Sequence, residues 1–142
     1  MTSLKKIRIL IGKLGLDAHY RGVQMLSMML RDAGMEVVYT GLFQTAETIV
    51  QTALDEDVGI VGLSFLSGEH LAYTEQVIKL LKKKGLGDLP LLVGGVMPKE
   101  DVSKLEKMDV YGIFRPDTPI EEITNCIRGA TKGAAANKAE RP

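Results

Sequence analysis

The chain has 142 residues, which is enough for one compact domain with a buried core and leaves little for a second. Its 18 Lys and Arg residues balance its 18 Asp and Glu residues, so the zero net charge offers no attraction to a nucleic-acid backbone or an anionic membrane. The single cysteine, Cys126, excludes an internal disulfide, and no secretory or membrane-spanning pattern is visible, so we expect a cytoplasmic protein.

Short apolar runs alternate with longer amphipathic segments along most of the chain. The apolar runs predict strands at residues 6–11, 36–40, 58–63, 89–93 and 112–114. The amphipathic segments predict helices at residues 23–33, 45–54, 69–84, 99–107 and 120–128. Thr45 is expected to cap the second helix, and Gly34 and Gly85 to end the first and third.

The fold class predicted from this alternation is α/β, a flavodoxin-like, doubly wound, five-stranded parallel sheet with helices on both faces. The expected strand order is 2-1-3-4-5, which places a ligand crevice at the carboxyl edge, between the first and third strands. We expect the domain to span residues 5–130. Residues 131–142 have no apolar periodicity and are expected to form a poorly ordered tail.

The turn after the first strand holds a histidine with a nearby carboxylate and glycine, namely Asp17, His19 and Gly22. A carboxylate that accepts one imidazole N–H leaves the other ring nitrogen free for a ligand, which is how metal-binding histidines are oriented. The alternative is a helix N-terminal histidine that donates to a backbone carbonyl, with Asp17 as a helix cap. The other histidine, His70, is expected to be structural or solvated.

Small residues dominate the turns after the third and fourth strands, where Ser64 and the pair Gly94 and Gly95 stand. Missing side chains at a strand end allow a thin or flat ligand to approach. Three other uses of this fold are disfavoured. The first turn breaks the dinucleotide-binding glycine spacing, the third strand ends without the Asp of a receiver domain, and the hydrolase elbow around Ser64 lacks its second glycine.

The three sets of turn residues together resemble the cobalamin-binding domain family. Its D-x-H-x-x-G, S-x-L and G-G motifs correspond here to Asp17, His19 and Gly22, to Ser64 and Leu66, and to Gly94 and Gly95. Within that family the chain is most similar to the small subunits of two-chain acyl-CoA mutases, of the methylmalonyl-CoA or 2-hydroxyisobutyryl-CoA type. Two residues depart from the subgroup pattern: Ala18 replaces Gly and Tyr20 replaces Asp. Asp117, where methylmalonyl-type chains carry Gly, favours the 2-hydroxyisobutyryl relatives.

The resemblance implies that adenosylcobalamin binds base-off, with His19 as the lower axial ligand of cobalt. Asp17 would accept the other imidazole N–H, with Lys13 behind it, and Ser64 would hydrogen-bond a ring nitrogen of the displaced nucleotide tail. The complete set of expected cofactor-binding residues is Lys13, Asp17, Ala18, His19, Tyr20, Arg21, Gly22, Ser64, Leu66, Gly94, Gly95 and Thr118.

Alternative interpretations remain open for several of these residues. Lys13 could be a solvated surface lysine, and Ser64 and Thr118 could be ordinary turn residues. The three methionines of the first helix, Met25, Met28 and Met29, are expected to serve helix packing rather than a site.

The activity implied by the resemblance is a radical 1,2-rearrangement of an acyl-CoA, an isomerase reaction, with this chain supplying no catalytic acid or base. The implied partner is a large, barrel-type mutase subunit that binds the acyl-CoA, and the resemblance allows a G-protein chaperone as a further partner. Nucleic acids and membranes are not expected partners. Two alternatives are a corrinoid carrier for methyl transfer, which should carry a helical cap before the first strand, and a cobalamin-binding regulator, which should carry a DNA-binding module.

Overall fold

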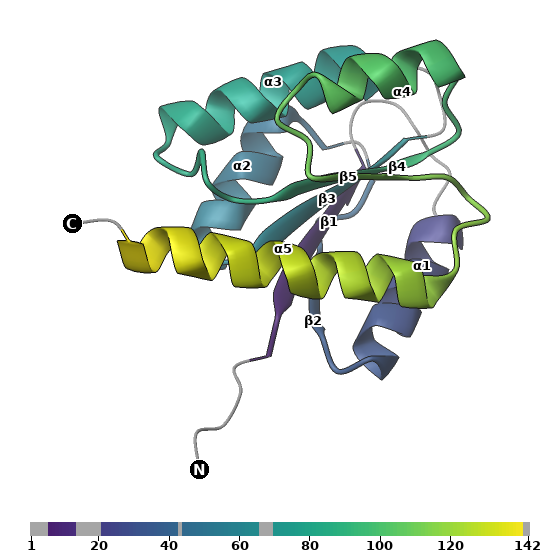
Figure 1. Cartoon of the computed structure of the whole chain (residues 1–142), viewed down its shortest axis with the longest axis horizontal. Coiled ribbons are helices and arrows are strands. Elements are labelled where there is room, and N and C mark those ends of the chain that lie inside the picture. Colours follow the sequence, from purple (N-terminus) through teal and green to yellow (C-terminus); the bar gives the residue numbers. More distant parts are fainter. Residues whose placement is uncertain (1–5, 14–20, 43, 66–69, 141–142) are drawn as a thin grey trace.

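A computed structural model describes residues 6–13, 21–42, 44–65 and 70–140, with the surroundings of side chains described as far as residue 132. Five parallel strands form one sheet in the order β2-β1-β3-β4-β5, which confirms the predicted fold class and strand order (Figure 1). The strands are β1 (Arg8–Lys13), β2 (Glu36–Tyr39), β3 (Ile60–Phe65), β4 (Leu91–Gly95) and β5 (Gly112–Phe114).

Helices cover both faces of the sheet, α1 and α5 on one face and α2, α3 and α4 on the other (Figure 1). Their bounds are α1 (Arg21–Asp32), α2 (Ala46–Asp55), α3 (His70–Lys83), α4 (Lys99–Glu106) and α5 (Ile120–Glu140). Because side chains alternate between faces along a strand, each face has its own apolar cluster. Ile9 and Ile11 of β1 belong to the cluster beneath α1 and α5, whereas Leu10 belongs to the other.

Helix caps are where the sequence pattern predicted them. The Thr45 side chain accepts the N–H of Thr48, and the Thr48 hydroxyl accepts the N–H of Thr45, which forms a reciprocal capping box at the start of α2. Gly34 and Gly85, after α1 and α3, have φ angles of +90° and +78°, the left-handed conformation of a C-terminal cap. The predicted caps are therefore confirmed.

Three strands extend beyond their predicted ends. β1, β3 and β4 end at Lys13, Phe65 and Gly95, two residues later than their apolar runs indicate. The cause is backbone pairing: these last residues are in register with those of the adjacent strands, and the sheet accepts polar residues and glycines there. Residues that we expected in turns consequently lie in the sheet.

Helix α5 is longer than predicted, and it continues into the segment that we expected to be an unstructured tail. The helix continues from Ile120 to Glu140, past the predicted end at Arg128. The added segment contains the run Ala134–Ala136, and alanine has the highest helix propensity of all residues, which outweighs the missing apolar periodicity. The tail expected at residues 131–142 is therefore helical up to Glu140.

The methionines of α1 also differ from expectation. Met25, Met28 and Met29 have exposed fractions of 59%, 63% and 42%, so the assignment of all three to helix packing was wrong. Helix α1 buries Val23 and Leu30 instead, and Met25 and Met29, although exposed, line the cavity described below. Because these methionines are apolar, the sequence pattern alone could not separate them from the residues of α1 that pack on the sheet.

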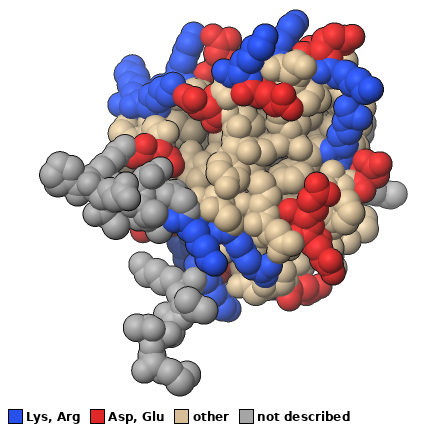
Figure 2. All heavy atoms as spheres, viewed as in Figure 1, with Lys and Arg blue, Asp and Glu red and all other residues tan. Residues whose placement is uncertain are grey.

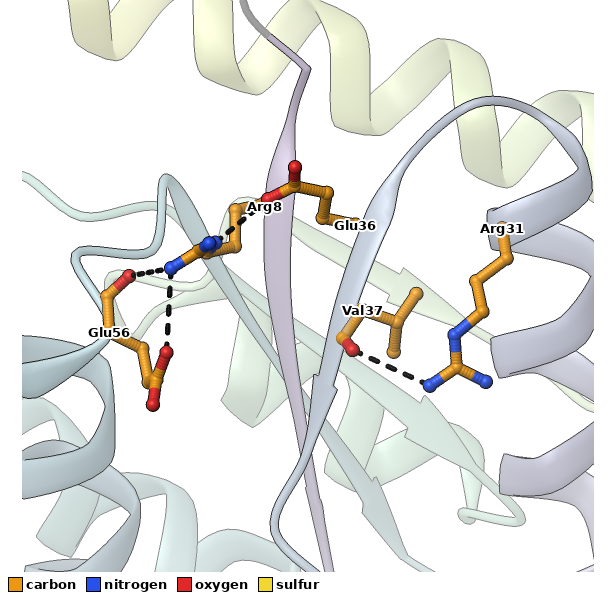
Figure 3. Close-up of polar contacts among 5 residues, drawn as sticks. All are labelled: Arg8, Arg31, Glu36, Val37 and Glu56. Carbon is orange, nitrogen blue, oxygen red and sulfur yellow. Dashed lines mark hydrogen bonds and ion pairs between the residues drawn. The ribbon is translucent and has the colours of Figure 1, made fainter.

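The amino-terminal end of β1 is held by an exposed charge network (Figure 3). Arg8 Nε donates to Glu36 on β2 at 2.9 Å, and its Nη1 donates to the Glu56 carbonyl after α2 at 2.8 Å. The hydrogen bond and charge of Glu36, followed by the charge of Glu56, raise the pKa of the Arg8 guanidinium. On α1, Arg31 donates to the Val37 carbonyl at 3.4 Å. These contacts connect β1, β2, α1 and the end of α2 at the edge of the sheet opposite the expected site.

A candidate cofactor-binding site at the carboxyl edge

A single transverse row of the sheet brings three predicted site residues together. Lys13 on β1 pairs with Ser64 on β3, Ser64 pairs with Gly94 on β4, and Gly94 pairs with Phe114 on β5. Adjacent strands are about 4.8 Å apart, so Lys13, Ser64 and Gly94 lie within reach of one small ligand group. We call Lys13, Ser64, Gly94 and Phe114 the floor row.

The floor row faces the layer between the sheet and helices α1 and α5, where a cavity of about 570 Å³ lies. Pockets for small molecules and cofactors commonly have volumes of roughly 300–1,000 Å³. The helical walls come from Val23 and Leu26 on α1 and from Ile123 and Ile127 on α5. This layer would otherwise hold core side chains, but Gly62, Ser64 and Gly94 contribute little volume to it. The carboxyl edge thus presents an apolar cavity with a small polar group on its floor.

The two glycines at the end of β4 have different roles. A Cβ added at Gly94 would meet only the carbonyl oxygen of Phe114, at an ordinary contact distance of 3.7 Å. A Cβ added at Gly95 would collide with the backbone carbonyl of Phe65, and Gly95 also has a φ of +141°. Gly94 therefore keeps the cavity open, whereas Gly95 permits a close approach of two backbones.

Lys13 is almost completely buried, with an exposed fraction of 2%, so it is not the solvated surface lysine that the sequence left possible. Ser64 is half-buried and lines the cavity. Thr118 also lines the cavity, and its hydroxyl accepts the N–H of Arg115 at 3.1 Å, so it is part of the turn after β5 as well. The two interpretations of Thr118, turn residue and cavity residue, are compatible.

The remaining predicted site residues lie mostly outside the described part of the chain: Asp17, Ala18, His19, Tyr20 and Leu66. Arg21 is the first residue of α1. Lys13 and Gly22, on either side of residues 14–20, both line the cavity. Within the described ranges, no group of three His, Cys, Asp or Glu side chains could hold a metal ion, and no helix is long and apolar enough to cross a membrane.

Two features of the site were not foreseen. The first is the wall formed by α5, whose apolar positions Ile120, Ile123 and Ile127 were visible as a periodic stripe. The second is a pair behind the cavity, in which Nε2 of the buried His70 lies 2.6 Å from Oδ2 of the partly buried Asp101.

Cys126, on α5, is half-buried. Burial, followed by the charge of Glu122, raises the pKa of its thiol, which disfavours a nucleophilic thiolate.

Charges lie around the margin of the face shown in Figure 2, and the centre of that face is uncharged. Positive and negative side chains are interspersed there, so this face carries no large patch of one sign.

The sequence profile of the B12 binding domain matches residues 7–124, which include all five strands and most of the cavity walls. The chain belongs to the B12-binding domain family. It is 46% identical over 130 residues to the 2-hydroxyisobutanoyl-CoA mutase small subunit of Aquincola tertiaricarbonis, covering 90% of this chain and 96% of that protein. It is 36% identical over 136 residues to the pivalyl-CoA mutase small subunit of Xanthobacter autotrophicus, covering 96% and 91%. These relatives are subunits of mutases, which are isomerases.

Among solved structures, this B12-binding domain is similar to a cobalamin-binding protein from Desulfitobacterium hafniense, with a TM-score of 0.73 and 26% identity, covering 87% of this chain and 59% of that one. The receiver domain of a Mycobacterium tuberculosis response regulator also superposes, with a TM-score of 0.67 over 92% of this chain and 99% of that one. At 16% identity, that likeness shows the shared fold alone.

Proposed function

We propose that this chain is the cobalamin-binding small subunit of a heteromeric acyl-CoA mutase, and that it holds adenosylcobalamin in the base-off form. The observation that carries the proposal is the cavity above the floor row, at the carboxyl edge of a B12-binding domain. Ligands of doubly wound α/β domains bind in this crevice, beside the point where the strand order reverses.

The cavity fits the nucleotide tail that leaves cobalt in the base-off form. A benzimidazole ring is flat and largely apolar, and the aliphatic walls of α1 and α5 offer it a matching surface. Gly94 leaves room for the ring over β4, and the Ser64 hydroxyl on the floor can donate a hydrogen bond to a ring nitrogen. Thr118 stands where the cavity meets the turn after β5.

His19 is the proposed lower axial ligand of cobalt. The proposal for this residue rests on the sequence motif, in which Asp17 stands two residues earlier and can hold the imidazole in one tautomer. Lys13 is the last residue of β1, four residues before Asp17, and it is buried. Its burial supports the proposed place behind Asp17, because a buried ammonium group requires a polar or charged partner. The proposed cofactor contacts are completed by Ala18, Tyr20, Arg21, Gly22, Leu66 and Gly95, the last of which lines the cavity.

When bound, adenosylcobalamin would supply the radical chemistry of a 1,2-rearrangement. This chain would bind and orient the cofactor, and a large, barrel-type subunit would bind the acyl-CoA and cover the reactive face. The higher identity to the 2-hydroxyisobutanoyl-CoA mutase subunit, 46% against 36%, favours that substrate class, as does Asp117. We further propose a cytoplasmic location and a G-protein chaperone as an additional partner.

Replacement of His19 tests the proposal directly. The purified chain, titrated with adenosylcobalamin, should give a base-off absorption spectrum. The cob(II)alamin form should show nitrogen hyperfine coupling in its electron paramagnetic resonance spectrum, because an imidazole nitrogen binds cobalt. The His19→Ala variant should lose this coupling and bind more than about tenfold more weakly, because losing even a residue that only supports a metal ligand typically costs about 10–100-fold.

A matched control is His70→Gln, which alters the other histidine of the chain and should retain the coupling. Coupling that persists unchanged in His19→Ala would reject His19 as the ligand. A wild-type spectrum with benzimidazole still on cobalt would reject the base-off proposal.

A further inference from the structure

The buried His70 and the partly buried Asp101 form a pair that lies outside the cavity lining. His70 has an exposed fraction of 2%, Asp101 one of 21%, and 2.6 Å separates His70 Nε2 from Asp101 Oδ2. A carboxylate carries no proton, so the imidazole Nε2–H donates to it. Within the described residues His70 Nδ1 is buried without a partner, so this single hydrogen bond is the ring's principal polar anchor.

Each partner of the pair lies in the first turn of the helix that follows a cavity-lining strand. His70 is the first residue of α3, which follows β3 and residues 66–69. Asp101 lies in the first turn of α4, which follows β4, and its N–H donates to the Pro98 carbonyl at 3.1 Å. The hydrogen bond therefore links the segment after β3 to the segment after β4.

The imidazole also contacts the back of the cavity wall. Its ring packs edge-on against Phe65, with 6.3 Å between the ring centroids and 65° between the ring planes. Phe65 is the last residue of β3, it lines the cavity, and its backbone carbonyl lies against Gly95. A continuous chain of contacts thus runs from Asp101 through His70 and Phe65 to Gly95.

We propose that His70 and Asp101 are positioning residues for the cobalamin site: their hydrogen bond fixes the ends of β3 and β4 relative to one another and so sets the shape of the cavity floor. This inference rests on the proposed function and adds a role for two residues outside the cavity. Neither residue touches the cavity, so they act through Phe65 and through the segment around Pro98.

The test is the affinity of the full-length chain for adenosylcobalamin, measured by absorption titration. His70→Ala and Asp101→Ala should each weaken binding by about tenfold, the lower end of losses known for residues that support a site from behind. His70→Gln keeps an N–H at the Nε2 position, and Asp101→Asn keeps an acceptor oxygen, so both should bind within about threefold of wild type. The double Ala variant should bind no more weakly than the weaker single variant, because both changes remove one interaction.

A loss of global stability is excluded by measuring the folded fraction at the titration temperature. A variant that is nine-tenths folded would have its apparent Kd raised only about 1.1-fold by unfolding. Thr74→Val, which changes a buried side chain one turn along α3, and Glu100→Ala, which changes an exposed neighbour of Asp101, are the matched controls and should bind like wild type. If His70→Ala does not fold, the pair Asp101→Ala and Asp101→Asn supplies the same comparison.

Hydrogen exchange of the cofactor-free protein gives a second readout. The amides of residues 93–97 should exchange faster in both Ala variants than in wild type, and at the wild-type rate in Asp101→Asn. Wild-type affinity in folded His70→Ala, or independent and multiplying effects of the two Ala changes, would overturn the inference. A wild-type chain that binds no cobalamin would overturn the proposed function, whereas the exchange experiment would still report whether the pair holds β4.

Discussion

Gly94 and Gly95 are adjacent in sequence, yet they have separate roles in the structure. Gly94 belongs to the floor row, and the space beside its Cα is the cavity itself. Gly95 lies one residue further, where the alternation of the strand turns it away from the floor row and against the Phe65 backbone. A G-G motif read from sequence cannot separate these roles, because both are consequences of strand pairing.

Gly94→Leu should strongly weaken cobalamin binding without unfolding the protein. The added side chain would enter the cavity, and its Cβ would make only an ordinary contact. Because glycine in a strand is conformationally costly, the melting temperature should not fall appreciably. We expect affinity for adenosylcobalamin to fall by more than about tenfold, the equivalent of roughly 1.4 kcal/mol.

Gly95→Ala is the matched comparison and should instead lower the stability of the folded chain. Its Cβ would collide with the Phe65 carbonyl at a strained φ, so we expect a loss of about 1–3 kcal/mol in the free energy of unfolding. Chemical denaturation measures the loss. Equal stability of Gly95→Ala and wild type, or intact binding by Gly94→Leu, would contradict this division of roles.

At the scale of elements, the type and order of every strand and helix could be predicted, but several boundaries could not. Apolar runs identify a buried strand, whereas its last residues are determined by pairing with neighbours that lie far away in sequence. The end of α5 was missed for a different reason. Its extension depends on the intrinsic helix propensity of alanine, and the periodicity of buried residues contains no information about it.

Shortening α5 to residue 132 should leave the site intact. Among the residues whose side chains the structure describes, those of α5 that line the cavity or belong to the core beneath it end at Ala130, so we expect the chain beyond Lys132 to be dispensable for both. A chain that ends at Lys132 should bind adenosylcobalamin within about twofold of wild type, since a change of that size lies within the few tenths of a kcal/mol expected for distant surface changes. A chain that ends at Glu122 is the control: it loses Ile123 and Ile127 and should not bind.

At the scale of the whole molecule, part of the candidate site was predictable. Sequence motifs selected Lys13, Ser64 and Gly94 separately, and the sheet places them in one row. The pair of His70 and Asp101 was not predictable in this way, because 31 residues separate them and neither belongs to a periodic pattern. Contacts between two helices that are remote in sequence become visible only once the fold is assembled.

Cofactor binding should stabilise the whole domain. The cavity exists only in the folded chain, so a ligand that fills it shifts the unfolding equilibrium toward the native state by mass action. Adenosylcobalamin at 100 times its Kd should add about 2.7 kcal/mol to the free energy of unfolding. Denaturation with and without cofactor measures this gain, and Gly94→Leu, which should bind more weakly, should show a smaller gain at the same cofactor concentration.

The same chain should not convert an acyl-CoA on its own, because in the proposed division of labour the substrate site belongs to the large subunit. Activity should appear on addition of that subunit with adenosylcobalamin, and an assay of the isomeric acyl-CoA product reports it. Turnover by the isolated small chain would refute the heteromeric assignment.

The floor row also bears on how such a domain can be re-engineered. Lys13, Ser64 and Gly94 belong to the hydrogen-bonded ladder of the sheet rather than to the connections above it. Connecting segments tolerate insertion and replacement far better than paired strands do. Replacing the segments after β3, β4 and β5 should therefore leave the floor row in place, whereas the cofactor contacts proposed for Leu66 and Thr118 would change with those segments.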